Sequence, residues 1–303
     1  MKLLILGGNG MAGHMLAEYF RRQGKHHIFH TTRDKNDLGG LYIDADDIAG
    51  VEKLVEIVSP HCIINAMGVL NQFAERDRIG AYHVNGFLPH RLRRVADQIR
   101  ARLIHISSDC VFEGTRGSYT EDDPADGTSV YALTKSLGEV RDPGHLTIRT
   151  SIIGPEIRSG GIGLMEWFLA QKGRVAGYEH VMWNGVTTLE LARAVDSLLG
   201  SDLSGLIHLA HPQPVSKYEL LQMMQAAFHK EDVEIFPQQN PVQDRTLVST
   251  RSDVTIKLPS YPQMLRELAD FMYSSEIPAS SEIPARSEIP ARSEIPTRSE
   301  LPI

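Results

Sequence analysis

Two side chains one helical turn apart suggest most directly what chemistry this chain performs. Tyr131 and Lys135 enclose the string Tyr-Ala-Leu-Thr-Lys, and on a helix this spacing projects both from one face. A ketone that receives a hydride becomes an alkoxide and needs a proton, which a tyrosine hydroxyl can donate. The pKa of that hydroxyl is ordinarily about 10, and a neighbouring ammonium lowers it by favouring the phenolate. The pair therefore predicts a ketone reductase.

Two serines upstream could orient such a ketone. The segment from His105 to Cys110 reads His-Ile-Ser-Ser-Asp-Cys and stands at the end of an expected strand. A serine hydroxyl in that place can donate a hydrogen bond to a substrate carbonyl and hold it beside the tyrosine. Serine pairs and Tyr-x-x-x-Lys spacings are each common by chance. Their combination behind a glycine-rich turn is specific.

That glycine-rich turn lies near the N-terminus and predicts a dinucleotide-binding site. Gly7, Gly10 and Gly13 follow an apolar strand and open a helix with the spacing Gly-x-x-Gly-x-x-Gly. The first glycine permits a tight turn, the second lets a pyrophosphate approach the backbone, and the third lets the helix pack closely on the sheet. The helix N-terminus then offers free N–H groups and a partial positive charge to the phosphates. We expect the pyrophosphate along this turn, from Gly7 through Asn9 to Met11.

The end of the second expected strand selects between NAD and NADP. An acidic side chain there would accept a hydrogen bond from the 2′-hydroxyl of NAD, whereas this chain has Thr31, Thr32 and Arg33, followed by Asp34. Hydroxyls and a guanidinium suit a 2′-phosphate, so we expect Thr32 and Arg33 to favour NADPH, with NADH as the alternative. The alternative for Arg33 itself is a solvated loop charge. Lys135 would in addition hold the ribose hydroxyls of the nicotinamide half.

Short apolar runs alternate with helical patterns through the first half of the chain. This alternation predicts right-handed βαβ units and a parallel sheet, whose strands are continuously apolar because both faces are covered. The fold class that we expect is α/β, a Rossmann-type doubly wound parallel sheet. The expected strands are 3–6, 27–31, 62–65, 103–107 and 146–149, and the expected helices are 11–22, 51–58, 81–100 and 131–140.

After about residue 150 this rhythm changes, which predicts a smaller C-terminal lobe that binds the substrate. Helices are expected at 188–199, 217–228 and 261–272, a strand at 206–210 and a loop at 237–241. The tail repeats Ser-Glu-Ile-Pro with a six-residue period, and its prolines block helix and central strand, so we expect disorder. The expected domains are a dinucleotide-binding domain at 1–150, completed by later segments, a substrate-binding lobe at 151–273 and the tail at 274–303.

Composition limits the partners of the chain. Its 303 residues have a formal net charge of −7, which argues against nucleic acid because phosphate backbones select basic faces. Its two cysteines are too few for a disulfide scaffold, and no apolar run is long enough for a membrane-spanning helix. The histidines are scattered, so no metal site is expected. We expect a cytoplasmic enzyme without membrane or nucleic-acid partners, and a homodimer is left open.

With these motifs in place, the sequence resembles the extended short-chain dehydrogenase/reductase superfamily and, within it, the dTDP-4-dehydrorhamnose reductase group. The resemblance covers about residues 1 to 272. Its most specific part is the string Ser-Ser-Asp-Cys-Val-Phe-Glu-Gly at 107–114. The other matching parts are the glycine turn, Asn-Ala-Met-Gly at 65–68, Asn85, the Tyr-x-x-x-Lys pair, Gly-Glu at 138–139 and Arg-Thr-Ser at 149–151.

This resemblance implies roles for individual residues. The catalytic triad would be Ser108, Tyr131 and Lys135, and the second lobe would grip the nucleotide sugar. The family commonly has threonine where Ser108 stands, a departure that keeps the hydroxyl. The residues that the resemblance places at the cofactor, with Asp44 near the adenine, are Asp44, Asn65, Ala66 and Met67.

Further residues are candidates for contact with the substrate. Trp183 could stack on the nucleotide base, with core packing as its alternative. Arg245 could pair with the diphosphate through its fork of donors, with a surface ion pair as its alternative. The full candidate set for the substrate is Ser108, Asp109, Cys110, Trp183, Asn184 and Arg245.

Two sugars are left open as the substrate. The substrate lobe of the family often carries Gly-x-Pro-Thr, whereas this chain reads Trp-Asn-Gly-Val-Thr-Thr at 183–188. With segments 215–218 and 245–247, this departure resembles a subgroup that reduces UDP-linked 2-acetamido-2,6-dideoxy-4-ketohexoses to sugars such as UDP-N-acetylquinovosamine. We therefore expect that substrate, for cell-surface polysaccharide synthesis, with dTDP-4-dehydrorhamnose as the alternative.

Three rival functions share the expected fold. A 4,6-dehydratase usually needs an Asp-Glu pair after the catalytic hydroxyl, but Cys110 follows Asp109 here. An epimerase-reductase similar to GDP-fucose synthase would use a cysteine and a histidine, for which Cys110 and His180 are candidates; the alternative for Cys110 is a small buried side chain. A cofactor-binding regulatory subunit, like the β subunit of methionine adenosyltransferase, is disfavoured because the triad is intact.

Overall fold

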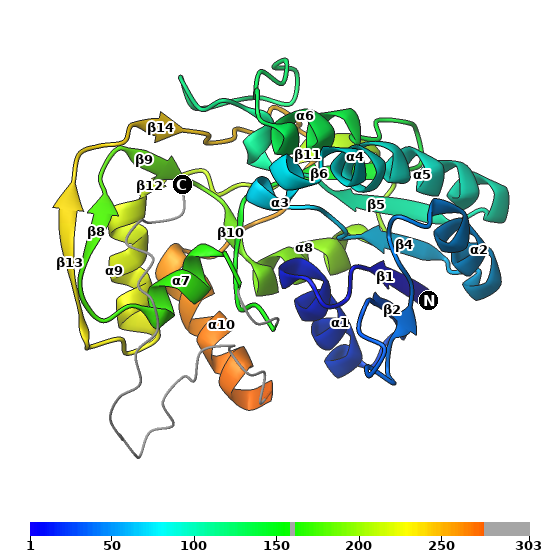
Figure 1. Cartoon of the computed structure of the whole chain (residues 1–303), viewed down its shortest axis with the longest axis horizontal. Coiled ribbons are helices and arrows are strands. Elements are labelled where there is room, and N and C mark those ends of the chain that lie inside the picture. Colours follow the sequence, from blue (N-terminus) through cyan, green and yellow to red (C-terminus); the bar gives the residue numbers. More distant parts are fainter. Residues whose placement is uncertain (158–160, 276–303) are drawn as a thin grey trace.

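A parallel sheet of seven strands forms the centre of the molecule (Figure 1). The computed structural model describes residues 1–157 and 161–275, so the expected repeat tail lies outside the described residues from 276 on. The strand order is β11-β6-β5-β4-β1-β2-β3, and every neighbouring pair is parallel. The expected fold class is confirmed. The strands are β1 (Lys2–Leu6), β2 (His27–Thr32), β3 (Leu41–Tyr42), β4 (Cys62–Asn65), β5 (Arg102–Ile106), β6 (Leu146–Arg149) and β11 (Gly205–His208).

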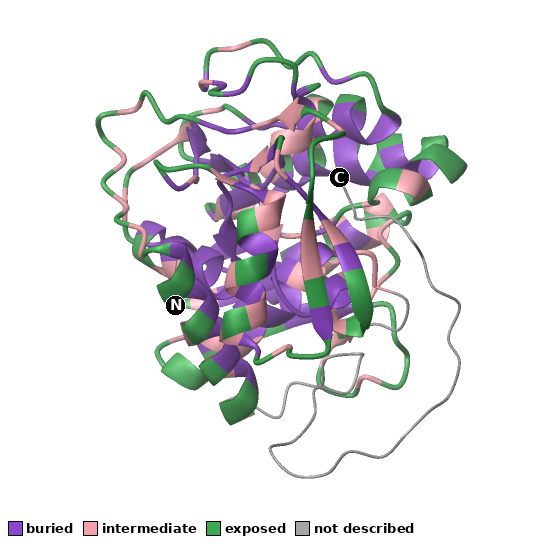
Figure 2. Ribbon diagram, turned by 90° about the vertical axis from the view of Figure 1, so that its left-hand side faces the viewer, coloured by how far each residue is buried: buried purple, intermediate pink, exposed green. Residues whose placement is uncertain are grey.

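Side chains of β1 alternate between two hydrophobic cores, one on each face of this sheet. Leu3 and Ile5 belong to the larger core, whereas Leu4 and Leu6 belong to the smaller one. All four are fully buried, because both faces of the strand are covered by helices. Figure 2 shows the resulting interior, with exposed residues confined to the outer surfaces.

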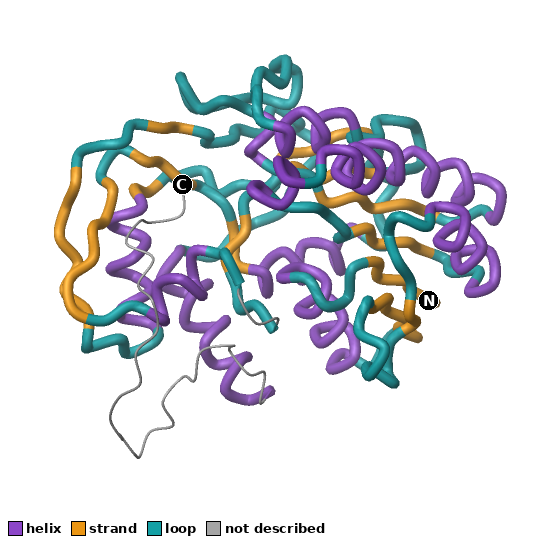
Figure 3. The backbone as a smooth tube through the Cα atoms, in the orientation of Figure 1, coloured by secondary structure: helices purple, strands orange, loops and turns teal. Residues whose placement is uncertain are grey.

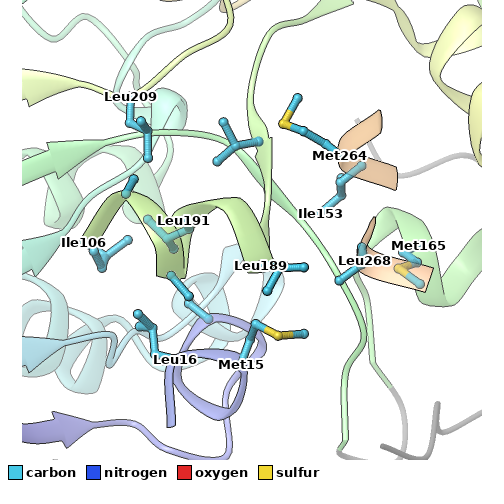
Figure 4. Packing of buried hydrophobic residues seen from close by; sticks show 14 of the residues in the cluster. Met15, Leu16, Ile106, Ile153, Met165, Leu189, Leu191, Leu209, Met264 and Leu268 are labelled. Carbon is cyan, nitrogen blue, oxygen red and sulfur yellow. The ribbon is translucent and has the colours of Figure 1, made fainter. Parts of the chain in front are cut away.

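Two pairs of helices cover the faces of the sheet. α1 packs against α8 over the larger core, and Figure 4 shows Met15 and Leu16 of α1 close to Leu189 and Leu191 of α8. α2 packs against α5 over the smaller core. Within the described parts of the chain, no helix combines the length and the apolar character needed to cross a membrane. The covering helices are α1 (Met11–Gln23), α2 (Ile48–Val58), α5 (Leu88–Ile99) and α8 (Thr188–Leu198).

The helix expected at 81–100 is interrupted by a π-helical turn. Helices α3 (Asn71–Arg76) and α4 (Arg78–Ala81) lead into this turn at Tyr82–Phe87, and α5 follows it. Pro89 stands in the first turn of α5, where it has no N–H to donate to the preceding turn. The π-helical turn packs against α6 (Val130–Leu137), which ends three residues before the expected end at 140.

The strand expected at 206–210 joins the central sheet. β11 pairs with β6 from Gly205 beside Leu146 to His208 beside Arg149. Helix α8, which precedes β11 in the chain, packs on α1. Two elements that come after residue 150 in the sequence therefore complete the half of the molecule that contains the central sheet.

The second lobe contains short strands that the sequence pattern did not predict (Figure 3). They form a parallel pair, β13-β8, and a three-stranded sheet, β12-β9-β14. The loop expected at 237–241 is wrong in its first two residues, because Pro237 and Gln238 continue β13 beside Gly177 and Tyr178. A proline is tolerated there because β13 is an edge strand. The remaining elements are β7 (Ile152–Ile153), α7 (Leu164–Ala170), β8 (Gly173–Tyr178), β9 (Val181–Trp183), β10 (Val186–Thr187), β12 (Val215–Ser216), α9 (Lys217–Ala227), β13 (Val233–Gln238), β14 (Gln243–Asp244) and α10 (Tyr261–Ser275).

Candidate active site

The turn between β1 and α1 is shaped by glycines. Gly7 has a φ of 84°, in the left-handed region that glycine adopts without strain. A Cβ at this position would come within 3.0 Å of the Ala66 carbonyl oxygen and the Met67 amide nitrogen. A Cβ on Gly13 would approach the Gly7 carbonyl oxygen to 2.1 Å. Gly7 therefore permits the turn, and Gly13 permits the close approach of α1.

The first turn of α1 forms an open cradle of backbone N–H groups. Gly10 is the N-cap of this helix, and no side chain caps it. A Cβ on Gly10 would meet only the Gly7 carbonyl oxygen, at 3.3 Å, among the described residues, so space for a ligand remains. Free N–H donors and the positive end of a helix dipole bind phosphate groups. The segment from Gly7 to Met11 thus fits the pyrophosphate of a dinucleotide.

Asn9 connects this turn to the end of β2 through a side-chain hydrogen bond. Its Nδ2 donates a hydrogen bond to Thr32 Oγ1 at 2.9 Å, and the Gly7 backbone N–H donates to Thr31 Oγ1 at 2.9 Å. Thr32 Oγ1 also accepts from the Asp34 backbone N–H at 3.0 Å. Asn9 and Thr32, both expected at the cofactor, therefore lie together and hold each other in place.

Arg33 and Asp44 lie on the exposed rim beyond β2 and β3. Both side chains are exposed. Within the part of the chain that the structure describes, no hydrogen bond or ion pair engages the Arg33 guanidinium, so it is available to a ligand. Asp44 shapes its own turn, because its Oδ1 accepts from the Asp46 backbone N–H at 3.2 Å.

Asn65 shapes the end of β4, next to the glycine turn. Its side chain is fully buried. Its Oδ1 accepts from the Met67 backbone N–H at 3.2 Å, and its Nδ2 pairs with His105 Nδ1 at 3.1 Å. These bonds hold the bend that brings Ala66 and Met67 against Gly7, so the structure places the segment 65–67 beside the cradle.

Asn85 connects the π-helical turn to α6. Its Oδ1 accepts from the Val69 backbone N–H at 2.8 Å, and its Nδ2 donates to the Val69 carbonyl at 2.9 Å and to Thr134 Oγ1 at 3.1 Å. Thr134 lies between the two residues of the Tyr-x-x-x-Lys pair. The asparagine therefore anchors the helix that carries that pair.

Tyr131 and Lys135 are buried on one face of α6. The helix begins after Ser129, whose side chain caps it by accepting from the Ala132 backbone N–H at 3.1 Å. Lys135 Nζ donates to the Ile106 carbonyl oxygen, at the end of β5, at 2.7 Å. Desolvation lowers the pKa of Lys135 to about 8, against the opposing influence of the Glu139 carboxylate.

Ser108 follows β5 and meets the tyrosine. Its Oγ accepts from the Cys110 backbone N–H at 3.1 Å and donates to Asp109 Oδ1 at 3.1 Å, which caps a 3-10 turn at Asp109–Val111. The Ser108 side chain also lies near the Tyr131 hydroxyl and lowers its pKa. The two hydroxyls therefore stand together where β5 ends.

Burial dominates the pKa of Tyr131. Desolvation raises this pKa well above its ordinary value, Cys110 and Asp109 raise it further, and Ser108 lowers it. The expectation that Lys135 lowers the pKa of the tyrosine is wrong for this structure, because the pKa shift arises from other groups and the ammonium bonds a backbone carbonyl. The phenol therefore stays protonated at neutral pH, which is the form that donates a proton.

Ser107 is engaged elsewhere, which distinguishes the two neighbouring serines. Its Oγ donates to Glu139 Oε1 at 3.0 Å. Glu139 in turn accepts two hydrogen bonds from Arg149, at 2.6 and 2.7 Å, and all three side chains are buried. This cluster joins the ends of β5 and β6 to the end of α6. Of the two serines, Ser108 is the one that meets Tyr131.

Trp183 and Asn184, expected at the substrate, serve the packing of the second lobe. Trp183 is buried, and its Nε1 donates to Ser151 Oγ at 2.9 Å. Asn184 is buried as well; its Nδ2 donates to the carbonyls of His211 and Leu247, and its Oδ1 accepts from the Leu247 backbone N–H. Their polar groups are used within the protein, so we do not carry them into the proposed substrate site.

Arg245 reaches the loop that follows β5. Its Nε donates to the Phe112 carbonyl at 2.9 Å, and its Nη1 lies 4.0 Å from Cys110 Sγ. The segment 215–218, which the family resemblance also singled out, places Lys217 at the start of α9, where desolvation lowers the pKa of its ammonium to about 8.

Cys110 and His180, the two residues that an epimerase-reductase would use, are not joined in this structure. His180 is exposed in the turn between β8 and β9, with its Nδ1 at 3.0 Å from the Gln239 carbonyl oxygen. Desolvation raises the pKa of the Cys110 thiol to about 12. No hydrogen bond or ion pair links the two side chains in the described ranges.

This fold and site define a class of protein. A doubly wound parallel sheet with a glycine turn after β1, a hydroxyl after β5 and a Tyr-x-x-x-Lys helix is the arrangement of extended short-chain dehydrogenases/reductases. The chain belongs more narrowly to the RmlD substrate binding domain family, whose sequence profile matches residues 1–252.

Named relatives of the chain include two kinds of protein that bear on its function. It is 33% identical over 157 residues, half of each chain, to dTDP-4-dehydrorhamnose reductase from Burkholderia thailandensis. It is 28% identical over 233 residues, 72% of each chain, to dTDP-4-dehydrorhamnose reductase from Mycobacterium tuberculosis. The second kind is the β subunit of methionine adenosyltransferase 2 from Rattus norvegicus, 24% identical over 245 residues, which are 75% of this chain and 72% of that one.

Solved structures share the fold. A crystal structure of dTDP-4-dehydrorhamnose reductase from Bacillus anthracis in complex with NADP superposes with a TM-score of 0.74 at 19% identity. The superposition covers 88% of this chain and 96% of that one. Both lobes therefore follow one common architecture.

Proposed function

We propose that this chain is an NADPH-dependent oxidoreductase that reduces the C4 ketone of a nucleotide-linked 4-keto-6-deoxyhexose. The observation that carries the proposal is the buried group of Ser108, Tyr131 and Lys135, in which Ser108 acts on the Tyr131 hydroxyl and Lys135 lies one helical turn further on. These residues follow β5 and lie on α6, at the sheet edge where the glycine turn also follows its strand. In open α/β sheets this edge is where ligands bind.

NADPH supplies the hydride when it is bound. The open cradle from Gly7 to Met11 and the free guanidinium of Arg33 suit its pyrophosphate and 2′-phosphate. The NADP complex of the Bacillus anthracis reductase supports the same cofactor.

The residues of the chain orient the ketone and deliver a proton. Ser108 and Tyr131 each donate a hydrogen bond to the C4 carbonyl oxygen and hold it in one position. As this oxygen becomes an alkoxide, Tyr131 transfers its phenolic proton to it. Burial keeps that phenol protonated until the transfer. Lys135 supplies the positive charge at the site and holds the ribose of the nicotinamide half.

Between the two candidate sugars, the named relatives support dTDP-4-dehydrorhamnose better than the UDP-linked acetamido sugar. Two of them are dTDP-4-dehydrorhamnose reductases. The UDP-linked 2-acetamido-2,6-dideoxy-4-ketohexose rests on the resemblance of the segments 183–188, 215–218 and 245–247, and Trp183 and Asn184 of the first segment are buried in the protein. We therefore place the dTDP sugar first.

The test is the oxidation of NADPH by the purified full-length chain with each sugar offered separately. Turnover of dTDP-4-dehydrorhamnose is the expected outcome, and NMR of the product would give the stereochemistry at C4. Turnover of the UDP sugar alone would replace the substrate and leave the reaction class intact. Tight binding of NADPH without reduction of either sugar would overturn the proposal.

That last outcome would favour a regulatory subunit. The similarity to the β subunit of methionine adenosyltransferase 2 supports keeping this second function. Co-purification of the chain with a methionine adenosyltransferase catalytic subunit would then be the decisive observation. The presence of Ser108, Tyr131 and Lys135 together supports the reductase over this reading.

A further inference from the structure

The loop between β2 and β3 carries the guanidinium that is proposed to bind the 2′-phosphate of the cofactor. It spans residues 33–40 and contains two cations, Arg33 and Lys35. The Lys35 ammonium lies over the ring of Tyr42, 5.4 Å from its centroid. Throughout the two described ranges, no hydrogen bond or ion pair engages the Arg33 side chain. Because a long exposed side chain has many rotamers, the place of this guanidinium depends on how firmly its loop is held.

A buried histidine of β2 joins this loop to α1. Arg21 Nη2 lies 2.7 Å from His30 Nδ1, and Asp37 Oδ2 lies 3.2 Å from His30 Nε2. An arginine can only donate, so Nδ1 is an acceptor, and Nε2 carries the ring proton that is donated to the carboxylate. His30 itself is buried. Spacing in the sequence does not indicate this series, because its members come from a helix, a strand and a loop.

Asp37 is the residue at which the loop folds back on β2. Its Oδ1 accepts from the Gly39 backbone N–H at 3.1 Å, and its own backbone N–H donates to the Asp34 carbonyl at 3.2 Å. A Cβ on Gly40 would lie 2.9 Å from Asp37 Oδ2 and 3.0 Å from His30 Nε2, so the backbone passes close beside this hydrogen bond. One carboxylate therefore shapes the turn and attaches it to the strand.

The same strand is attached to the glycine turn. A Cβ on Gly8 would lie 2.5 Å from His30 Cδ2, so the imidazole packs directly against that turn. Two residues further along β2, Thr32 Oγ1 accepts from Asn9 Nδ2 and from the Asp34 backbone N–H. Side chains two residues apart on a strand lie on one face. His30 and Thr32 therefore hold the glycine turn and the loop in a fixed relation to each other.

We propose that His30 and Asp37 are positioning residues for the choice of cofactor, because they hold the loop so that Arg33 meets the 2′-phosphate of NADPH. Both act through Arg33 and contact neither the phosphate nor the reacting atoms. This inference rests on the proposed function, since the 2′-phosphate is the group that distinguishes NADPH from NADH. A released loop would present Arg33 correctly for only a fraction of the time, and the affinity for NADPH would fall by that fraction.

The test measures cofactor binding without any reduction step. Isothermal titration calorimetry of the full-length chain with NADPH and with NADH would compare the wild type with Asp37→Ala. We expect the substitution to weaken NADPH about fivefold or more, which corresponds to a loop that is correctly placed about a fifth of the time, and to change NADH less than about twofold. An equal loss for both cofactors would indicate general damage to the domain and would overturn the inference.

A double-mutant cycle identifies the residue through which Asp37 acts. Arg33→Ala alone removes the contact with the 2′-phosphate. In that background Asp37→Ala should cause no further loss of NADPH affinity, because two residues that serve one contact do not have additive effects. Additive losses would show that Asp37 acts through another group, and the positioning role would be wrong.

Two further variants separate the hydrogen bond from the charge. Asp37→Asn removes the negative charge but keeps one carbonyl oxygen that can accept from His30 Nε2, so it should retain more of the preference for NADPH than Asp37→Ala. Tighter NADPH binding by both variants would mean that the carboxylate only repels the phosphate, which contradicts the inference. His30→Phe keeps a ring beside Gly8 and removes both nitrogens, so it should match Asp37→Ala.

Asp202→Ala is the matched control. This carboxylate is exposed in the loop that precedes β11, at the amino ends of the parallel strands, whereas the glycine turn follows the carboxyl end of β1. Both cofactor affinities should equal those of the wild type. A thermal unfolding curve for each variant would show that it is folded, and the partly exposed Asp37 provides the decisive variants if His30→Phe is not.

The proposals fail separately. A selective loss of NADPH in Arg33→Ala, with unchanged affinities in Asp37→Ala, contradicts the positioning role only. An equal loss of NADPH and NADH in Arg33→Ala contradicts the proposed contact with the 2′-phosphate, and the positioning role with it. A chain in which Asp37→Ala selectively weakens NADPH but which reduces neither sugar contradicts the reductase proposal only.

Discussion

The hydroxyl groups at the end of β5 differ in what each one bonds. Ser107 donates to the buried Glu139, whereas Ser108 meets the buried phenol of Tyr131. Adjacent residues on an extended chain point to opposite sides, so only one of the two can meet the tyrosine. Spacing alone predicts a serine pair without separating its members, whereas the family resemblance singles out Ser108. The bonding of Ser107 to Glu139 supports that choice.

Replacing Tyr131 by phenylalanine tests the proton donor. The hydroxyl is the only group removed, so Tyr131→Phe should lower kcat by about a hundredfold or more, the range of a lost general acid. NADPH affinity, measured by fluorescence titration, should stay close to that of the wild type. Tyr273→Phe, on an exposed part of α10, is the control and should keep full activity. Substantial turnover in Tyr131→Phe would remove this residue from the proposed role.

Replacing Arg33 by alanine tests the choice of cofactor. The free, exposed guanidinium of Arg33 has a 2′-phosphate as its proposed partner, so Arg33→Ala should weaken NADPH about tenfold or more while NADH changes little. Binding of both cofactors by calorimetry checks this. Arg174→Ala, which breaks an exposed ion pair with Glu234, should change neither affinity. An equal loss of affinity for NADPH and NADH would show that Arg33 does not bind the 2′-phosphate.

Among the helices and strands, those strands that are buried on both faces could be predicted from the sequence. The short strands and the irregular helical turns could not. The five expected strands of the first half all lie in the sheet, because their apolar runs leave few alternatives. The strands of the second lobe are two to six residues long, and such runs carry little periodic signal. The sequence pattern over 81–100 is continuously helical, so it did not predict the π-helical turn before α5.

The ends of β5, β6 and α6 are joined by a buried charge cluster. Glu139 accepts two hydrogen bonds from the fully buried Arg149 and one from Ser107. Glu139→Ala would leave the guanidinium buried without its partner, which destabilises proteins by about 3–5 kcal/mol. Urea unfolding measures the free energy of unfolding. Glu56→Ala, which removes half of an exposed pair with Lys53, is the control and should cost nothing measurable. Equal stability of the two variants would refute the role of the cluster.

At the scale of the whole molecule, the loop after β5 connects the catalytic edge to the second lobe. Gly114 lies in this loop with a φ of 88°, and its carbonyl accepts from the Asp244 backbone N–H at 2.8 Å. Further along, Tyr119 forms a bridge with Leu247. Ser108, proposed to hold the ketone, and Arg245, a candidate for contact with the substrate, are therefore linked through one short segment.

Substituting Gly114 by alanine should disturb this link. The new Cβ would lie 2.7 Å from the Arg245 Cγ and require a strained backbone. We expect a higher KM for the nucleotide sugar and weaker dTDP binding, with NADPH affinity unchanged because the glycine turn is remote in the chain. Gly200→Ala, which meets nothing within 4 Å among the described residues, is the control. Unaltered dTDP binding by Gly114→Ala would contradict the coupling.

The position of β11 at the edge of the sheet also determines when this protein can fold. Its backbone pairs with β6, yet more than 50 residues separate the two strands in the chain. During synthesis, β6 emerges from the ribosome first and presents an unpaired edge, which invites pairing with other chains. The central sheet thus reaches its final form only after the chain as far as β11 has been translated. A ribosome stalled before residue 205 should therefore hold a chain that is more easily digested by protease than one stalled beyond residue 275.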